Sequence, residues 1–393
     1  MSQRLISHSP DLKRLQDDGY EVEIKDSYLV LNHIPYVNAN RAVAYGTLVS
    51  TLALSGDVTA RPDTHVVTFV GEVPCDHEGS ALTQILNSSG RQELLPGLAI
   101  DHTFSSKPAA GYADYYEKMT TYVAILASAA QAINPNATAT TFRVIEDNDE
   151  EAVFRYRDTA SSRAGIGAIA AKLRVGKIAI VGMGGTGSYI LDLVAKTPVA
   201  EIHLFDGDRF LSHNAFRAPG AASMDDLRAQ PTKAAYYQQQ YDRMRRGIVA
   251  HETNVDIDNV ELLRDMDFVF LALDDGAAKK MLVERLEEFE VPFIDVGMGL
   301  YQAEGSLAGL ARVTTSTPQQ RDHIRKRNRI PFEASGADNE YAQNIQIADM
   351  NALNAALAVV KWKKLLGFYS DLDNEHFAVY QVDGNSLINE DRP

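Results

Sequence analysis

One segment, residues 177–208, constrains the fold of this chain more than any other. Its sequence is KIAIVGMGGTGSYILDLVAKTPVAEIHLFDGD. The apolar run at 178–181 predicts a buried strand, and the apolar residues of 188–196 recur at helical spacing. The junction between them holds the glycines Gly182, Gly184, Gly185 and Gly187. A strand, a glycine-rich turn and a helix in this order predict a nucleotide-binding βαβ unit.

The glycines of this turn have separate expected roles. Gly182 lets the chain turn, Gly184 lets the backbone approach a phosphate, and Gly187 lets the helix pack against the strand. The helix N-terminus then offers unpaired N–H groups to an anion. A second apolar run, 201–205, ends at Asp206, where such units place the carboxylate that binds ribose hydroxyls. The segment therefore predicts a nucleotide site.

The composition, with 45% hydrophobic and 23% charged residues, is that of an ordinary globular protein. The length of 393 residues favours two domains. A net charge of −15 argues against a nucleic-acid partner, because such binding needs a basic face. The single cysteine, Cys75, excludes a disulfide framework and a zinc site built from paired cysteine motifs. No apolar run approaches the roughly 18 residues of a membrane span, so we expect a cytoplasmic protein without a membrane partner.

Residues 1–150 predict an N-terminal α+β domain. Its expected elements are a helix at 11–16, strands at 20–24, 28–31 and 65–70, an apolar run at 46–54 and a long helix at 112–133. Short strands are expected at 141–145 and 152–156, and a helix at 161–173. The acidic run EDNDEE at 146–151 is the expected linker.

Residues 151–393 predict an α/β domain. Strands are expected at 178–182, 201–205, 248–252, 267–273 and 292–296, and helices at 185–196, 232–245, 259–264 and 276–290. A further long helix at 344–366 and a last strand at 376–382 follow. This alternation predicts a doubly wound, mostly parallel sheet, Rossmann-like, with helices on both faces and a site at the carboxyl ends of its strands.

Polar side chains follow successive strands of this predicted sheet. They are Asp206, Asp208, Asn214, Arg217, Lys233 and Asp274. Because the carboxyl ends of parallel strands meet at one edge, we expect these side chains to converge on one pocket. Arg217 and Lys233 suit the neutralisation of phosphates, and Asn214 suits a hydrogen bond to them. Asp206 would hold the ribose and Asp274 would hold Mg²⁺. A redox dinucleotide site does not need such a cluster of cation, amide and second acid, which disfavours hydride transfer.

Together these residues carry a resemblance to a known family. GMGGTGS, the string DGDRFLSHNAFR, Lys233 and the LDD at 273–275 resemble the ThiF/MoeB-type adenylation domain shared with ubiquitin-activating enzymes, over roughly residues 155–385. Asp206, Asp208, Asn214 and Arg217 fall on the marked positions of the family motif, Lys233 on its phosphate lysine and Asp274 on its magnesium aspartate. Phe210, His213, Ala218 and Asp275 depart from the family's Val, Ser, Gln and Asn.

The resemblance implies a reaction. ATP and the C-terminal carboxylate of a ubiquitin-like protein would react at the α-phosphate and give an acyl-adenylate and pyrophosphate, as the first step of a bacterial-type conjugation pathway. It implies ATP and Mg²⁺, with no zinc expected. It also implies a homodimer in which an arginine reaches the phosphates bound by the neighbouring copy. Arg157 is the candidate for that role, and Arg163 is its competitor.

The thioester cysteine of ubiquitin-activating enzymes has no counterpart in the corresponding segment, 297–344. Cys75 is the remaining candidate, and the acidic neighbours Asp76 and Glu78 would raise its pKa and reduce its reactivity. Residues 1–150 faintly resemble the ubiquitin-conjugating fold, without its catalytic cysteine beyond Gly79. A docking module for the ubiquitin-like protein or a conjugating enzyme is therefore one expectation, and a plain α+β partner-binding domain is an equal one.

Three alternatives to the activation of a ubiquitin-like protein stay open at this point. The substrate could be a sulfur-carrier protein of cofactor biosynthesis. The chain could be a non-catalytic scaffold that senses ATP. It could also be a nicotinamide-dependent oxidoreductase, although the cluster of cation, amide and second acid disfavours that class.

Overall fold

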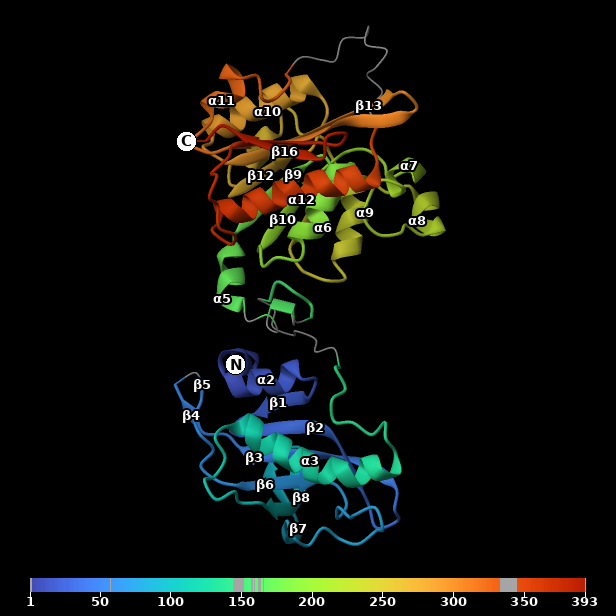
Figure 1. The fold of residues 1–393 in the computed structure, drawn as a ribbon, viewed down its shortest axis with the longest axis vertical. Coiled ribbons are helices and arrows are strands. Elements are labelled where there is room, and N and C mark those ends of the chain that lie inside the picture. Colours follow the sequence, from blue (N-terminus) through green and yellow to red (C-terminus); the bar gives the residue numbers. More distant parts are fainter. Residues whose placement is uncertain are drawn as a thin grey trace. The chain divides into compact units, whose positions relative to one another are not determined.

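The computed structural model describes residues 2–56, 58–143, 152–156, 158, 160–161, 164, 166–332 and 345–392 (Figure 1). The expected linker at 146–151 lies outside this set. Contacts divide the chain into two compact units, one of Met1–Ile145 with Ser162–Ala164 and one of Glu146–Ser161 with Gly165–Pro393. No helix among the described residues combines the length and the apolar character that crossing a bilayer requires.

The first unit is built on a six-stranded antiparallel sheet of order β1-β2-β3-β6-β8-β7. Its strands are β1 (Glu21–Lys25), β2 (Tyr28–Val37), β3 (Val43–Thr51), β6 (Val66–Val70), β7 (Leu86–Leu95) and β8 (Leu98–Ser105), and β4 (Leu54–Ser55) pairs separately with β5 (Val58–Thr59). The helices are α1 (Ser2–His8), α2 (Pro10–Asp17) and α3 (Tyr115–Ile133). The core side of α3 repeats at helical spacing, with Tyr115, Met119, Tyr122 and Leu126 fully buried.

The sequence predicted α2 and α3 well but missed other parts of this unit. The long helix begins at Tyr115 rather than at 112, because the carboxylate of Asp114 accepts a hydrogen bond from the Glu117 amide at 2.8 Å and caps it. Residues 141–143 form no strand, and 144–145 lie outside the described residues. Strand β7 was missed because its side chains are mostly exposed on both faces, so it shows no apolar alternation.

The second unit is built on an eight-stranded sheet of order β11-β10-β9-β12-β13-β14-β15-β16. Its strands are β9 (Lys177–Val181), β10 (Glu201–Phe205), β11 (Ile248–His251), β12 (Phe268–Leu271), β13 (Phe293–Ala303), β14 (Ser306–Ser316), β15 (Phe377–Gln381) and β16 (Ser386–Glu390). The five strands from β11 to β13 are parallel, and the remaining pairs are antiparallel. The prediction of a mostly parallel, Rossmann-like α/β sheet beside a separate α+β unit is confirmed.

Helices cover both faces of this sheet, as a doubly wound fold requires. One face carries α6 (Gly185–Val194), α9 (Lys233–Tyr241) and α12 (Ala348–Leu365), and the other carries α10 (Gly276–Glu288), η2 (Val260–Leu263) and α11 (Asp322–Lys326). Shorter helices are α5 (Gly167–Ala170), η1 (Ala171–Leu173), α7 (Ser212–Ala215) and α8 (Met224–Ala229). Of the helix expected at 161–173, the described residues are helical at 161 and at 167–173, the latter as α5 and η1. The strand expected at 152–156 is only an isolated bridge between Phe154 and Arg245.

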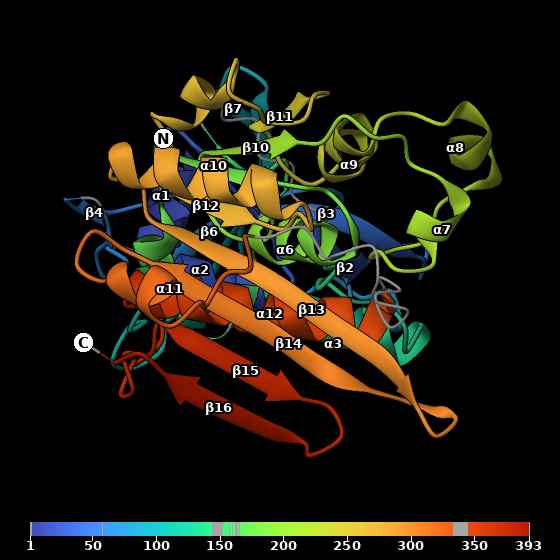
Figure 2. The same ribbon diagram turned by 90° about the horizontal axis from the view of Figure 1, so that it is seen from above.

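The largest difference from expectation is the hairpin of β13 and β14 (Figure 2). A strand was expected at 292–296, whereas β13 continues to Ala303 and returns as β14. Gly297 and Gly299 interrupt the apolar pattern after Val296, and the hydrogen bonds to β14 extend the strand past them. The strand expected at 376–382 is β15, and it is followed by β16 rather than being the last.

Three histidines of this unit, of which His323 and His376 are buried and His251 is half-buried, predict a loss of stability in mild acid. Burial is the main factor that lowers the pKa of His251, His323 and His376. Because their pKa values are depressed in the folded state, the unfolded chain binds more protons as the pH falls below about 6.5. We expect the thermal unfolding midpoint to fall between pH 7.5 and 5.5, with a smaller fall in His251→Gln. An equal or higher midpoint at pH 5.5 would contradict this prediction.

Candidate nucleotide-binding site

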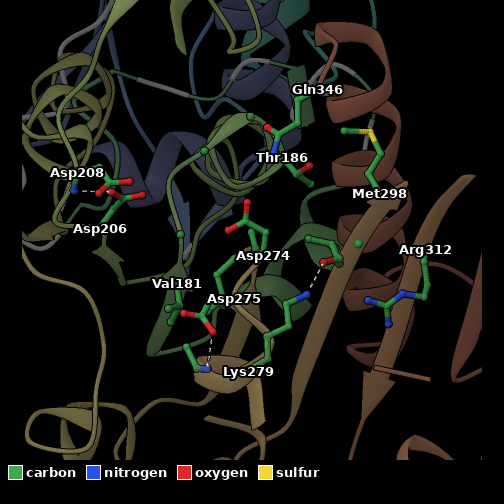
Figure 3. Close-up of a pocket in the computed structure, with 18 of the residues that line it drawn as sticks. Val181, Thr186, Asp206, Asp208, Asp274, Asp275, Lys279, Met298, Arg312 and Gln346 are labelled. Carbon is green, nitrogen blue, oxygen red and sulfur yellow. Dashed lines mark hydrogen bonds between the residues drawn. The ribbon is translucent and has the colours of Figure 1, made fainter. Parts of the chain in front are cut away.

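A cavity of about 820 Å³ opens at the carboxyl ends of β9, β10 and β12, where the strand order reverses. Its volume lies in the upper part of the range of roughly 300–1,000 Å³ that is typical of small-molecule sites. Figure 3 shows its lining side chains. Eight predicted site residues line it, namely Gly182, Gly184, Gly185, Asp206, Asp208, Arg217, Lys233 and Asp274.

The glycine turn leaves space on its cavity side and none behind it. Gly182 has φ of +91°, and a Cβ there would lie 2.6 Å from the carbonyl oxygen of Ala272. A Cβ on Gly187 would overlap the carbonyl oxygen of Gly182, so this glycine packs the helix against the turn and does not line the cavity. A Cβ on Gly184 would meet no atom within 4 Å. Gly184 therefore borders open space that a ligand can occupy.

Asp206 holds the shape of this turn. Its carboxylate accepts hydrogen bonds from the backbone amide of Met183 at 2.7 Å and from that of Asp208 at 2.9 Å, and the residue is 5% exposed. Nζ of Lys233 lies 3.5 Å from Asp206 and 2.7 Å from the carboxylate of Asp208. The side chain of Asp208 is 66% exposed, which makes it the more accessible acid at this corner. The ribose contact of Asp206 stays a prediction.

Asn214 and Arg217 present buried donors at the end of α7. Oδ1 of Asn214 accepts a hydrogen bond from the amide of Leu211 at 2.9 Å. Its Nδ2, like Nε of Arg217, is buried without a hydrogen-bond partner among the residues that the structure describes. Buried donors are nearly always satisfied, so an orphan donor on a residue that lines a cavity is a candidate ligand-binding group. Arg217 lines the cavity, whereas Asn214 is not among the residues that line it.

Two departures from the family pattern have a structural explanation. Phe210 is 1% exposed and stacks on Tyr236 of α9 with ring centroids 3.9 Å apart, so the larger side chain fills the core. Asp275 accepts hydrogen bonds from the amides of Ala277 at 2.9 Å and Ala278 at 3.0 Å. Aspartate and asparagine are equally good N-caps, and this substitution therefore preserves the start of α10.

Asp274 is exposed and directed toward the middle of the cavity (Figure 3). The described residues include no group of three or more histidine, cysteine or acidic side chains that could hold a metal ion alone. Mg²⁺, however, is commonly held by one or two carboxylates together with phosphates and water. One carboxylate beside a nucleotide cavity fits that pattern, and the metal role of Asp274 stays a prediction.

Asn351 is a supporting residue that the sequence did not identify. It is fully buried on α12, where Oδ1 accepts a hydrogen bond from Oγ1 of Thr186 at 2.8 Å and Nδ2 donates to the carbonyl of Arg217 at 3.4 Å. It thereby joins the glycine turn to the segment that carries Arg217. Another buried amide, Asn354, donates to the carbonyl of Gly297 at 3.0 Å. The sequence signal that could have identified these two residues is the presence of asparagines within an otherwise apolar helix.

A buried ion cluster at the cavity was also missed. Lys279 of α10 and Arg312 of β14 both contact the carboxylate of Asp295 of β13, and both cations line the cavity. The sequence signal that could have revealed this cluster is Asp295 inside the apolar run FIDV. A charged residue in a buried strand requires a partner of opposite charge.

Arg157 and its competitor Arg163 lie outside the described residues. In the first unit, Cys75 is 2% exposed, and burial is the main factor that raises its pKa, followed by the charges of Asp76 and Glu72. The expected direction of its pKa is confirmed, with burial as a larger cause than the charges.

Two family models match the chain. The model of the ThiF family matches residues 157–386, and that of a domain of unknown function, DUF6791, matches residues 10–159. No curated protein matches the chain. The ThiF match covers more than half of the 393 residues.

One similar solved structure is that of E. coli MccB with succinimide, whose sequence is 19% identical to this chain. The alignment covers 57% of this chain and 66% of the MccB chain, and its TM-score is 0.43. E. coli MccB with the selenomethionine form of MccA has 18% identity, coverage of 60% and 73%, and a TM-score of 0.45. Selenomethionine PaaA has 18% identity, coverage of 57% and 75%, and a TM-score of 0.44. This chain thus spans just under two thirds of the first MccB chain. The chain belongs to the ThiF family.

Proposed function

We propose that this chain binds ATP in the cavity and adenylates the C-terminal carboxylate of a ubiquitin-like protein. The observation that carries the proposal is Arg217, whose buried Nε has no partner among the described residues and which lines the same cavity as Gly184, where open space remains. Donors of this kind suit phosphate oxygens, and the N-terminus of α6 adds backbone N–H groups at the same place. Membership of the ThiF family supports adenylation as the reaction.

In the proposed reaction, a carboxylate oxygen of the substrate forms a bond to the α-phosphorus of ATP. The bond from the α-phosphorus to the bridging oxygen breaks, and pyrophosphate leaves with the bonding electrons. Arg217 and Lys233 would neutralise the phosphates, for which Lys233 would exchange its contact with Asp208. Asp274 would hold Mg²⁺, which supplies further charge neutralisation when bound. The first half-reaction thus needs positioning and charge rather than a side-chain nucleophile.

The N-terminal unit would recruit the substrate or a conjugating enzyme. Cys75 is a poor thioester nucleophile, because it is buried and its pKa is raised by that burial. Any later thioester would therefore form on a second enzyme. A homodimer with Arg157 reaching the neighbouring site also belongs to this proposal. A sulfur-carrier protein would use the same adenylation chemistry and differs only in the partner.

Exchange of labelled pyrophosphate into ATP tests the proposal. We expect the full chain to bind ATP in calorimetry and to catalyse exchange only when a cognate protein with a free C-terminus is present. Small proteins that end in glycine and are encoded by neighbouring genes supply the panel, and the same proteins with an amidated C-terminus are the control. ATP capture without exchange for every member would favour a sensing scaffold. Binding of NADH in place of ATP would reject adenylation.

A further inference from the structure

A second charged cluster lines the same cavity, away from the glycine turn. We call Lys279, Asp295 and Arg312 the basic corner. Nζ of Lys279 lies 2.7 Å from one carboxylate oxygen of Asp295, and Nη2 of Arg312 lies 2.7 Å from the other. In the view of Figure 3, Lys279 and Arg312 lie across the cavity from Asp206 and Asp208.

The basic corner carries an excess of positive charge in a buried place. Two cations share one carboxylate, and the side chains of Lys279, Asp295 and Arg312 are 4%, 0% and 11% exposed. A buried charge without a counter-ion is costly, whereas a ligand anion removes that cost. Of the other acids that line this part of the cavity, Asp275 is already engaged as the cap of α10, and Asp274 would be neutralised by the Mg²⁺ of the proposed function. The excess charge therefore favours an anionic ligand.

Hydrogen bonds hold both cations in fixed positions. Nζ of Lys279 donates to the carbonyl of Val296 at 3.3 Å, and Nη1 of Arg312 donates to Oγ1 of Thr314 at 2.8 Å and to the carbonyl of Arg329. The guanidinium crosses Gly297, where a Cβ would lie 2.5 Å from Nη2. Because the donors are held before any ligand arrives, little side-chain entropy remains to be lost on binding.

The walls beside the basic corner are apolar. They are formed by Met298, Leu300, Leu310 and Pro331, which line the cavity together with the two cations. Low polarity strengthens a charge-assisted hydrogen bond and excludes competing water. These walls also offer contact to the last residues of a peptide chain, whereas a triphosphate gains nothing from them.

We propose that the basic corner binds the carboxylate of the acyl substrate, in the same cavity as the nucleotide. This inference rests on the proposed function, since it assigns a place to the second reactant of the adenylation. One net positive charge matches the single negative charge of a carboxylate. A triphosphate carries several negative charges, and Lys233, Arg217 and the glycine turn are available to it. The pair Lys279 and Arg312 thus selects a chain that ends in a free carboxylate.

Saturation-transfer NMR on the full chain tests this assignment with two matched probes. N-acetyl-glycylglycine carries the carboxylate, and its carboxamide carries none, while α,β-methylene-ATP saturates the nucleotide site without reacting. We expect the wild type to bind the acid about tenfold or more tightly than the amide, because a charge-assisted contact is lost in the amide. Equal binding of the two probes, or no binding of either, would overturn the proposal.

Substitutions in the basic corner test whether the preference for the acid probe arises there. We expect Arg312→Gln and Lys279→Gln to remove the preference for the acid and to change the affinity for α,β-methylene-ATP less than twofold. Arg325→Gln is the matched control, since its guanidinium pairs with Glu287 on the surface and does not line the cavity. Gly297→Ala retains all charges but displaces the guanidinium, and a thermal melt reports whether each variant folds.

Two outcomes separate this inference from the proposed function. If Arg312→Gln loses tenfold or more in affinity for α,β-methylene-ATP but none for AMP, the basic corner holds the outer phosphates and the carboxylate assignment is wrong. If the wild type prefers the acid but never exchanges pyrophosphate with any substrate, the carboxylate subsite stands and the adenylation proposal fails.

Discussion

Arg217→Ala is expected to lower the rate of ATP–pyrophosphate exchange by about 10²–10³-fold while the thermal unfolding midpoint stays unchanged or rises. Its Nε is buried without a partner among the described residues, and such a donor costs about 1–3 kcal/mol in the absence of ligand. Removal of the side chain relieves that cost. The same removal takes away a donor that would meet the charge developing on the phosphates.

Arg209→Ala is the matched control for this variant. Arg209 lies in the same segment, is exposed, and donates to the carbonyl of Gln230 at 2.7 Å without lining the cavity. It should retain wild-type exchange with the cognate protein and wild-type ATP affinity in calorimetry. Exchange by Arg217→Ala within threefold of the wild type, or a large loss of its stability, would refute a role of Arg217 in charge neutralisation.

Alanine substitutions at two glycines of one turn are expected to have opposite effects. Gly187→Ala should destabilise the fold by about 3 kcal/mol or more, because its Cβ would overlap the carbonyl oxygen of Gly182, a backbone atom that cannot move aside. Gly184→Ala should retain stability, since φ there is −74° and a Cβ meets no atom within 4 Å. Its methyl group would instead occupy the space of the phosphates and lower ATP affinity about tenfold.

Denaturant unfolding and calorimetric titration with ATP separate the two effects. Gly187→Ala should shift the unfolding curve before any nucleotide is added. Gly184→Ala should unfold as the wild type does and differ only in the titration. If both variants bind ATP as the wild type does, the nucleotide does not approach this turn and the site assignment is wrong.

The sequence predicted the part of the site that depends on neighbouring residues. Strand β9, the glycine turn and α6 are continuous in the chain, and their periodicity and glycine spacing identify them without any tertiary information. The convergence of Arg217, Lys233 and Asp274 on one cavity followed from a general rule, since the carboxyl ends of parallel strands meet at one edge.

The sequence by itself determined the parallel half of the sheet and the residues at its carboxyl edge, because local pattern and chain order specify both. Only the tertiary structure decided that β13 and β14 form one hairpin and that Asp295 joins Lys279 to Arg312. It also decided which donors stay without partners in the described chain. These features depend on pairing and burial between residues distant in sequence, and no local periodicity encodes them.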